Sequence, residues 1–334
     1  MVWRKVNFIL AEMTFLRYFI PLIIEGNNRG LESTIFYLPC NKYTCPRRHY
    51  DILVNLSSEY KFDIKNIDQI NENSGLMFMI EGVGRGYCDN RYKKISLTYM
   101  TDFVGMYAAY VHEVDYVIFP SEFMASLRSE ISVSEKDLYL GSPKYDISFD
   151  SEEIYKKYNI NDNKILLYNK KKAFVILPRQ RDMLNVDFKI LYDSLRELDF
   201  SIITKTRGKD PFSQSHIRGN YHFMDFSWYP HDSMELMHAS DLVINFSSTA
   251  IKECVLLKKP LVNFHIKPFK KPLDFLYDYK YCENFEAQYD IDKFKESVQF
   301  LTSADLDSEF DMSIKNHLFE KGNVSKKILD YLER

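Results

Sequence analysis

The sequence predicts an α/β fold made of two doubly wound domains. Three observations support this prediction. The 334 residues exceed what one hydrophobic core usually organises, short apolar runs alternate with helix-like segments, and the alternation occurs in both halves of the chain. Hydrophobic residues make up 46% of the chain and charged residues 27%, a balance that is typical of a globular protein rather than a disordered one.

The elements follow from the apolar pattern. In the first half, the strand-like runs are Val6–Leu10, Ser33–Leu38, Leu76–Ile80, Ile95–Tyr99 and Tyr116–Phe119, and the helix-like segments include Met13–Ile24 and Phe123–Ile131. In the second half, the strand-like runs are Ala173–Leu177, Ser201–Thr204, Tyr221–Phe223, Leu242–Phe246 and Leu261–Phe264. The helix-like segments there are Asp187–Leu198, Ser233–His238, Ala250–Leu257 and Asp292–Thr302. Strands that alternate with helices indicate βαβ units and therefore parallel sheets.

The domain boundary is expected where the apolar pattern fades into polar and turn residues, around residues 146–163. We therefore divide the chain into residues 1–150 and residues 151–334. A short amphipathic helix is predicted at Lys326–Glu333, with Asn323 or Ser325 as its cap.

Charge and cysteine content narrow the class of protein. The formal net charge of −3 argues against a general nucleic-acid binder. Five cysteines without a disulfide or standard zinc spacing indicate a reducing compartment, so we expect a cytoplasmic protein without a bound metal. The lysine clusters at Lys170–Lys172 and Lys267–Lys271 are either solvated loops or a peripheral contact with the inner face of a membrane.

The most informative segment is His238–Phe264. A buried strand, Leu242–Phe246, leads into the hydroxyl turn Ser247, Ser248 and Thr249, and a helix follows from Ala250. A hydroxyl turn between a parallel strand and a helix is suited to anions, because backbone N–H groups and the helix dipole face the ligand. The simpler alternative is that Ser248 or Thr249 only caps the helix.

Glu253 lies four residues after Thr249, so it does not have the spacing of a capping box. A helical side chain tilts back toward the N-terminus, and Glu253 can therefore reach the mouth that the hydroxyls line. There it would accept hydrogen bonds from two ribose hydroxyls. The alternative is a solvated surface carboxylate.

These residues resemble a known family. Ser-Asp-Leu-Val-Ile-Asn-Phe-Ser-Ser-Thr-Ala-x-x-Glu, followed by Lys-Lys-Pro-Leu-Val, is similar to the donor-binding motif of GT-B-fold glycosyltransferases. The similarity is greatest to the branch with CDP-glycerol glycerophosphotransferases, lipid A disaccharide synthase and UDP-N-acetylglucosamine 2-epimerases. It implies that Ser247, Ser248 and Thr249 contact the donor pyrophosphate and that Glu253 binds the ribose.

Weaker similarities extend the resemblance over about residues 95–265. Leu140–Asp146 resembles the Gly-x-Pro-x-x-Asp element that closes the N-terminal domain in this branch, and Ile203–Arg207 resembles a strand-end element. The resemblance implies two Rossmann-like domains that face each other across a cleft. The N-terminal domain would take the acceptor and the C-terminal domain the nucleotide-linked donor.

Further donor-binding candidates follow from position. Four cations are expected at strand ends, where they would neutralise a leaving nucleotide: Arg179, Arg181, Lys205 and Arg207. Tyr229 and Pro230 precede a helix for which Ser233 is a candidate N-cap, and we expect them to cradle the base. Solvated loops are the alternative for the cations.

Two carboxylates are candidates for a catalytic base. Asp102 follows a predicted strand, at a place where the related glycerophosphotransferases carry a His-Gly pair that this sequence lacks. Asp102 would take the proton from the acceptor hydroxyl, or it is a turn residue. Glu81 opens the turn Glu81–Gly86 after another strand and is the second candidate, although a structural loop explains that turn equally well.

We therefore expect a metal-independent glycosyltransferase that moves a sugar from a nucleotide-linked donor to a surface-polysaccharide or glycolipid acceptor, with no cofactor. The alternatives are a CDP-glycerol-type polyol-phosphate transferase, a nucleotide-sugar 2-epimerase and a non-catalytic nucleotide-sugar-binding module. The sequence does not specify the base, the sugar, the acceptor or the stereochemical outcome.

Overall fold

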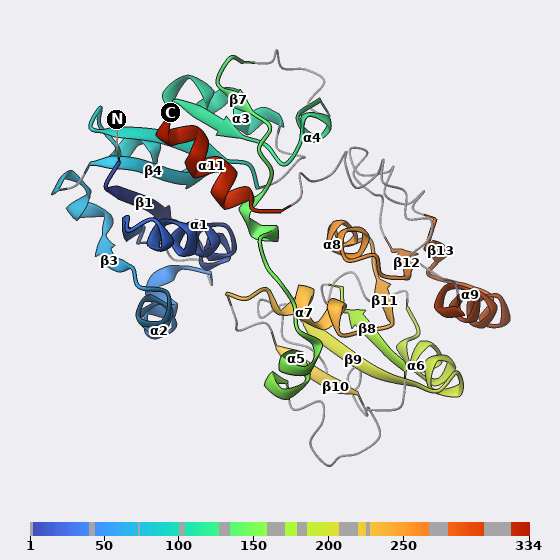
Figure 1. The fold of residues 1–334 in the computed structure, drawn as a ribbon. Helices are drawn as coiled ribbons and strands as arrows, with labels where there is room; N and C mark the ends of the chain where they lie inside the picture. Colours follow the sequence, from blue (N-terminus) through green and yellow to red (C-terminus); the bar gives the residue numbers. More distant parts are fainter. Residues whose placement is uncertain are drawn as a thin grey trace. The chain divides into compact units, whose positions relative to one another are not determined.

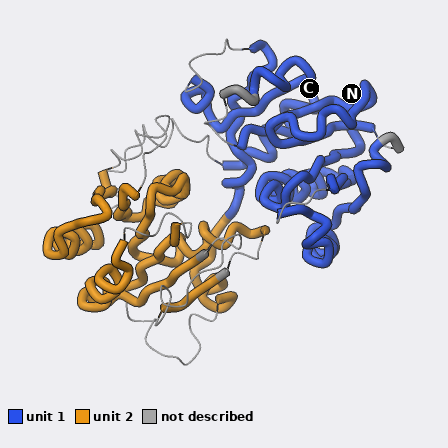
Figure 2. Tube along the Cα trace, turned by 180° about the vertical axis from the view of Figure 1, so that it is seen from behind, with its two compact units in different colours: residues 1–147, 316–334 blue, residues 148–315 orange. Residues whose placement is uncertain are grey.

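The computed structural model divides into two compact units (Figure 2). It describes residues 3–39, 44–72, 74–99, 104–126, 134–158, 171–178, 186–206, 220–224, 228–266, 280–303 and 322–334. Unit 1 comprises residues Met1–Ile147 and Asn316–Arg334, and unit 2 comprises residues Ser148–Lys315. The chain therefore leaves unit 1 beside residue 150, where the sequence places the boundary, but its last residues return to unit 1 instead of staying in the second domain.

Unit 1 is built on a seven-stranded parallel sheet (Figure 1). In chain order its strands are β1 (Lys5–Leu10), β2 (Glu32–Tyr37), β3 (Asp63–Asn66), β4 (Gly75–Ile80), β5 (Tyr92–Leu97), β6 (Tyr116–Ile118) and β7 (Asp137–Leu138). Across the sheet the order is β3-β2-β1-β4-β5-β6-β7. The chain thus winds outward from β1 in one direction and, from β4 on, in the other, as in Rossmann-like folds.

The helices of unit 1 are α1 (Leu16–Asn28), α2 (Tyr50–Tyr60), α3 (Val104–Tyr110), α4 (Glu122–Ser126) and α11 (Val324–Glu333). Short 3-10 segments lie at Met13–Phe15, Pro46–His49, Ile67–Glu72, Arg85–Tyr87, Val111–Glu113 and Pro143–Tyr145. Within the described residues, no helix is long and apolar enough to cross a bilayer.

Unit 2 repeats the design with a six-stranded parallel sheet in the order β10-β9-β8-β11-β12-β13. Its strands are β8 (Lys171–Ile176), β9 (Phe200–Thr206), β10 (Tyr221–Met224), β11 (Leu242–Asn245), β12 (Leu261–His265) and β13 (Cys282–Glu286). Its helices are α5 (Ser151–Lys157), α6 (Phe188–Glu197), α7 (Asp232–His238), α8 (Ile251–Leu256) and α9 (Ile291–Ser303). The predicted α/β fold with two doubly wound domains is confirmed.

Three strands and three helices are absent from the elements that the sequence predicts, and the strands share a reason. β3, β7 and β13 are three of the four edge strands of the two sheets. An edge strand is covered less completely than a central one, so it needs no continuous apolar run. β13, for example, reads Cys-Glu-Asn-Phe-Glu and fully buries only Phe285. The helices that the sequence does not predict are α2, α3 and α5. Of these, α2 buries only Leu53 and Leu56, and α5 buries only Ile154.

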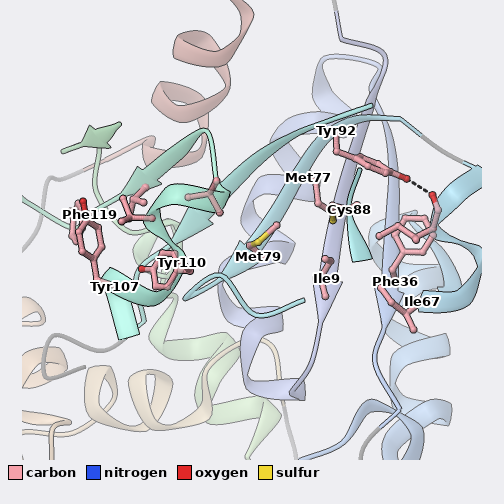
Figure 3. Packing of buried hydrophobic residues seen from close by; sticks show 14 of the residues in the cluster. Ile9, Phe36, Ile67, Met77, Met79, Cys88, Tyr92, Tyr107, Tyr110 and Phe119 are labelled. Atoms are coloured by element: carbon pink, nitrogen blue, oxygen red, sulfur yellow. Dashed lines mark hydrogen bonds between the residues drawn. The ribbon is translucent and has the colours of Figure 1, made fainter. Parts of the chain in front are cut away.

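One hydrophobic cluster in the core of unit 1 joins β4, β5 and α3 (Figure 3). Tyr107 and Tyr110 of α3 have ring centroids 5.8 Å apart, and Tyr107 packs against Phe119 at 6.0 Å. Their hydroxyls leave the apolar cluster to meet carboxylates: Tyr107 donates to Asp137 at 2.5 Å and Tyr110 to Glu81 at 2.9 Å. The core thereby fixes the turn that follows β4.

The C-terminal helix α11 is held on unit 1 by a carboxylate far away in sequence. Asp146 accepts hydrogen bonds from the backbone N–H groups of Val324 at 2.9 Å and Ser325 at 2.6 Å. Asn323, the residue before the helix, is left-handed with φ of 50° and makes no side-chain cap. The predicted cap from Asn323 or Ser325 is therefore wrong, and Asp146 takes that role.

A guanidinium fastens the other side of the same helix. Arg29, at the end of α1, pairs with Asp330 at 2.7 Å and Glu333 at 3.0 Å, and it donates to the carbonyl of Lys326 at 3.2 Å. Trp3 adds a hydrogen bond from its indole N–H to the carbonyl of Leu332 at 3.1 Å. These contacts, together with the cap, explain why the last residues belong to unit 1.

We predict that Asp146→Ala lowers the free energy of unfolding of unit 1 by about 2 kcal/mol, because two backbone donors lose their cap. The chain has two tryptophans, Trp3 in unit 1 and Trp228 in unit 2, so a Trp228→Phe background makes Trp3 the reporter in urea unfolding. Asn323→Gly, which keeps the left-handed backbone and removes only the local side chain, is the matched control and should change stability little. Equal losses for the two variants would contradict the capping role of Asp146.

Candidate functional site

The strand orders identify one edge of each sheet as the place where a ligand is expected. In a doubly wound sheet, ligands bind at the carboxyl ends of the strands where the winding direction reverses. In unit 2 the reversal lies between β8 and β11. The chain leaves β11 at Asn245 and passes directly through Ser247, Ser248 and Thr249, so the hydroxyl turn lies at this point.

Ser247 has a structural task in this turn. Its backbone is left-handed with φ of 47°, and the residue is 4% exposed. Its hydroxyl donates to the carbonyl of Phe264 at 3.1 Å and accepts from the N–H of Ile266 at 3.3 Å, which ties the turn to the end of β12. The prediction that the Ser247 side chain faces a ligand therefore needs correction, because the neighbouring strand engages that hydroxyl.

Thr249 presents the donors that Ser247 does not. It is exposed, and within the described residues neither its backbone N–H nor its hydroxyl has a hydrogen-bond partner. Ser248 is half-buried, with its hydroxyl 3.4 Å from the N–H of Ala250. The helix α8 begins only at Ile251, and its N-cap, Ala250, makes no side-chain cap. With six residues α8 is under two turns long, so its dipole is small. The hydrogen-bond donors of the turn therefore matter more for an anionic ligand than the helix dipole does.

Glu253 lies in the first turn of α8 and is 4% exposed. The alternative of a solvated surface carboxylate is therefore excluded. Burying a carboxylate is costly unless polar partners compensate it, so this side chain has a specific environment beside the hydroxyl turn.

The cation Lys205 is buried near the end of β9 and reaches α7. Its ammonium donates to the hydroxyl of Ser233 at 2.9 Å. The helix α7 begins at Asp232, so Ser233 is its second residue and not the N-cap that the sequence suggests. Tyr229 and Pro230, joined by a cis peptide bond, lie just before this helix. The other predicted cations, Arg179, Arg181 and Arg207, lie outside the described residues.

A polar cluster behind α7 was not anticipated from the sequence. Tyr158 lies 2.9 Å from Asp232 and 2.6 Å from Glu235, through its hydroxyl, and Lys157 pairs with Glu235 at 2.7 Å. Burial, together with the two carboxylates, raises the pKa of the Tyr158 hydroxyl well above its ordinary value. The cluster fixes the start of α7, and with it the position of Ser233, whose hydroxyl accepts from the ammonium of Lys205. Its sequence signal is weak, since the partners are more than 70 residues apart.

In unit 1 the corresponding reversal lies between β1 and β4, and Glu81 follows β4. Glu81 is buried, with φ of 48°, and accepts hydrogen bonds from the N–H of Tyr99 at 2.6 Å and the hydroxyl of Tyr110 at 2.9 Å. Gly82, next in the turn, has φ of 64°, and a side chain there would meet the ring of Tyr110 at 2.5 Å. Glu81 thus binds the turn to β5 and α3. Asp102 lies outside the described residues.

Two Asp-x-Asp pairs, a spacing used by metal-dependent transferases, occur at Asp290–Asp292 and Asp305–Asp307. Asp290 caps α9, because it accepts hydrogen bonds from the N–H groups of Asp292 at 2.9 Å and Lys293 at 3.0 Å. The second pair lies outside the described residues. Over the part of the chain that the structure describes, no three His, Cys, Asp or Glu side chains gather into a metal-binding group.

Structural comparison finds proteins that share this architecture over nearly their whole length. A UDP-GlcNAc 2-epimerase from Neisseria meningitidis, bound to UDP-GlcNAc, has a TM-score of 0.67 at 12% identity and covers 98% of this chain and 99% of its own. The glycotransferase of kitacinnamycin has a TM-score of 0.61 at 10% identity, with 100% of both chains covered. This is the GT-B fold. The GT-B fold agrees with the predicted resemblance and with the two Rossmann-like sheets.

A wall teichoic acid polymerase is also similar in structure to this chain. Its TM-score is 0.60 at 14% identity, and the match covers 98% of this chain and 88% of the polymerase chain. No protein-family model and no curated protein sequence matches the chain. At identities of 10–14% the comparisons establish the GT-B fold of the chain and not its reaction.

Proposed function

We propose that this protein is a glycosyltransferase of the GT-B type that binds a nucleotide-linked sugar at the carboxyl edge of the unit 2 sheet. The observation that carries the proposal is the exposure of Thr249 with its hydrogen-bond donors unpaired in the described structure. Thr249 offers two hydrogen-bond donors, its N–H and its hydroxyl, at the strand reversal between β8 and β11. Donors without a partner at this point of a doubly wound sheet suit phosphate oxygens.

The similar structures support a nucleotide sugar as the ligand. The Neisseria meningitidis epimerase is bound to UDP-GlcNAc, and another similar protein is named as a glycotransferase. We extend this ligand class to the present chain, with Ser248 and Thr249 on the pyrophosphate and Glu253 on the ribose. Lys205 and the segment Tyr229–Pro230 would line the same edge from β9 and from the loop before α7.

We assign the acceptor to unit 1, with Asp102 as the base that takes the proton from its hydroxyl group. Glu81 is the weaker candidate, because its carboxylate already accepts hydrogen bonds from Tyr99 and Tyr110. The proposed acceptor is a glycan or a lipid-linked glycan, reached by peripheral contact with the cytoplasmic face of a membrane. No metal or cofactor takes part in this scheme.

A nucleotide-sugar 2-epimerase is the second candidate, favoured by the epimerases among the similar structures. The two activities differ in one requirement, since an epimerase converts the nucleotide sugar without an acceptor. Incubation of the protein with UDP-GlcNAc alone, followed by sugar analysis, separates them: a C2 epimer would replace the transferase proposal. Polyol-phosphate transfer from a CDP-linked donor, the alternative that the sequence resemblance leaves open, is recognised by a preference for CDP or CMP over UDP.

We predict that Glu253→Gln weakens binding of a ribonucleotide about 10-fold and of its 2′-deoxy counterpart by much less. A carboxylate accepts hydrogen bonds from both ribose hydroxyls, each worth about 1.5 kcal/mol when the acceptor is charged, and only the ribose form offers both. Calorimetric titration of UDP and 2′-deoxy-UDP measures the two losses. Asp241→Asn, at an exposed carboxylate on the opposite end of β11, is the control. Equal losses for both nucleotides would remove Glu253 from the ribose.

A further inference from the structure

Three neighbouring strands of unit 2 share one dipeptide. Asn-Phe occurs at residues 245–246, 263–264 and 284–285, in β11, β12 and β13 or directly after. The parallel register pairs Asn245 with Asn263 and Asn263 with Asn284. Because side chains alternate between the faces of a sheet, the asparagines line up on one face and the phenylalanines on the other.

The two faces behave differently. The Phe246 and Phe264 rings stack with centroids 5.2 Å apart, and Phe285 continues the row at 5.9 Å from Phe264. On the other face, Asn263 donates through Nδ2 to Oδ1 of Asn284 at 3.1 Å, and Asn245 donates through Nδ2 to Oδ1 of Asn263 at 2.9 Å. We call Asn245, Asn263 and Asn284 the asparagine ladder.

The asparagine ladder ends on the hydroxyl turn. Oδ1 of Asn263 also accepts from the N–H of Ser247 at 3.2 Å, and Nδ2 of Asn245 also donates to the carbonyl of Ser248 at 3.2 Å. Since one of these backbone groups is a donor and the other an acceptor, they dictate the orientation of both amides. Asn245 and Asn263 are fully buried, so water does not compete for these bonds.

Within the described residues, the asparagine ladder leaves one buried acceptor without a hydrogen bond, which is energetically unfavourable. Oδ1 of Asn245 is buried and has no hydrogen-bond partner in the described structure. Turning the amide around would give that oxygen no donor, because it would then face the carbonyl of Ser248 and Oδ1 of Asn263. An orphaned buried acceptor is normally avoided, so the orientation of the Ser248 carbonyl is maintained at the expense of Asn245.

The orientation of the Ser248 carbonyl determines that of the next N–H. The carbonyl accepts from Asn245 at 3.2 Å and from the N–H of Ile251 at 3.2 Å. In a trans peptide the C=O and the following N–H point in opposite directions. The N–H of Thr249 is therefore turned away from these partners, which agrees with the exposure of Thr249.

We propose that the asparagine ladder is a positioning device that holds the Ser248–Thr249 peptide with its N–H outward, as a donor to a phosphate group of the ligand. The inference rests on the proposed nucleotide site and identifies residues that act through the turn rather than by touching the ligand. Amides suit this task because they lock the turn without placing a negative charge beneath an anionic ligand, as aspartates would.

The alternative is that the asparagine ladder only keeps the strands in register. The phenylalanine face provides a matched control, because Phe264 is fully buried and adjoins Asn263 in the same strand. A register role predicts that Asn263→Ala and Phe264→Leu have the same kind of effect. A positioning role predicts that only the asparagine variant changes the preference for phosphate.

The experiment compares UDP, by calorimetry, with uridine, by ligand-observed NMR, on the full chain. For Asn263→Ala we expect the dissociation constant of UDP to rise about 10-fold or more and that of uridine to stay within about 2-fold, since one hydrogen bond to a charged group is lost. Phe264→Leu should lower the melting temperature without changing the ratio of the two constants. Asn284→Ala, at the exposed end of the ladder, provides a milder variant if Asn263→Ala does not fold, with a change of about 3-fold in the same direction.

Equal losses of UDP and uridine in the asparagine variants, with UDP still bound by the wild type, would overturn the positioning role and leave the proposed function intact. A wild-type chain that binds no UDP or other nucleoside diphosphate would overturn the proposed function, and the ligand role of the ladder with it.

Discussion

Replacing Ser248 and Thr249 together by alanine is expected to raise the dissociation constant for a nucleoside diphosphate by about 100-fold. Each hydroxyl is proposed to donate to a phosphate oxygen, and a hydrogen bond to a charged group contributes about 1.5–3 kcal/mol. The backbone N–H of Thr249 remains in the variant, so binding should weaken without being abolished. Calorimetric titration of wild type and variant measures the change.

The control for this variant is a second hydroxyl pair in the same unit. Thr302 and Ser303 lie at the end of α9, and Thr302 accepts from Lys171, the first residue of β8, at 3.3 Å. They therefore lie at the amino edge of the sheet, away from the hydroxyl turn. The double alanine variant at these positions should bind as the wild type does. Unchanged affinity in the Ser248 and Thr249 variant, with the fold intact by circular dichroism, would reject the turn as a phosphate site.

Asp102→Asn is expected to lower turnover by about 10²–10⁴-fold while donor binding stays nearly the same. Asparagine keeps the shape of the side chain but cannot take the proton from the acceptor hydroxyl. The measurement is the release of nucleoside diphosphate from the bound donor, with donor affinity determined in parallel.

Glu81→Gln is the matched comparison for the Asp102 variant. An amide oxygen at this position still accepts from the N–H of Tyr99, so the turn after β4 should persist and turnover should change little. If Asp102 is a turn residue instead, asparagine substitutes well, because the two residues serve about equally in caps and turns. Near-normal turnover of Asp102→Asn combined with a large loss in Glu81→Gln would exchange the two assignments.

The sequence predicted the central strands of both sheets because these strands are buried on both faces and read as apolar runs. It missed β3 and β13, whose exposed edges tolerate charged residues. The return of α11 to unit 1 could not be predicted from local pattern, since its cap, Asp146, lies 178 residues from Val324. The motif around Asp146 is visible in the sequence, but the capping of α11 by its carboxylate depends on the fold.

The hydroxyl turn illustrates the same limit at the site. Composition and spacing located Ser247, Ser248 and Thr249 correctly at the end of a buried strand, but not which hydroxyl faces inward. That choice depends on the left-handed backbone at Ser247 and on its contacts with Phe264 and Ile266, which belong to the next strand. The asparagine ladder has a signal in the sequence, the recurrence of Asn-Phe in three neighbouring strands, but that signal can be interpreted only when the register is known.

Titration of the wild-type chain with UDP, CDP, CMP, GDP and dTDP in a calorimeter tests the central claim most directly. We predict that one nucleoside diphosphate binds with a dissociation constant in the micromolar range, and that the Ser248 and Thr249 double variant weakens the same nucleotide about 100-fold. The nucleotide that binds also separates a UDP-sugar donor from a CDP-linked one. A folded protein that binds none of the five would contradict the assignment of a nucleotide-linked donor to the edge of the unit 2 sheet.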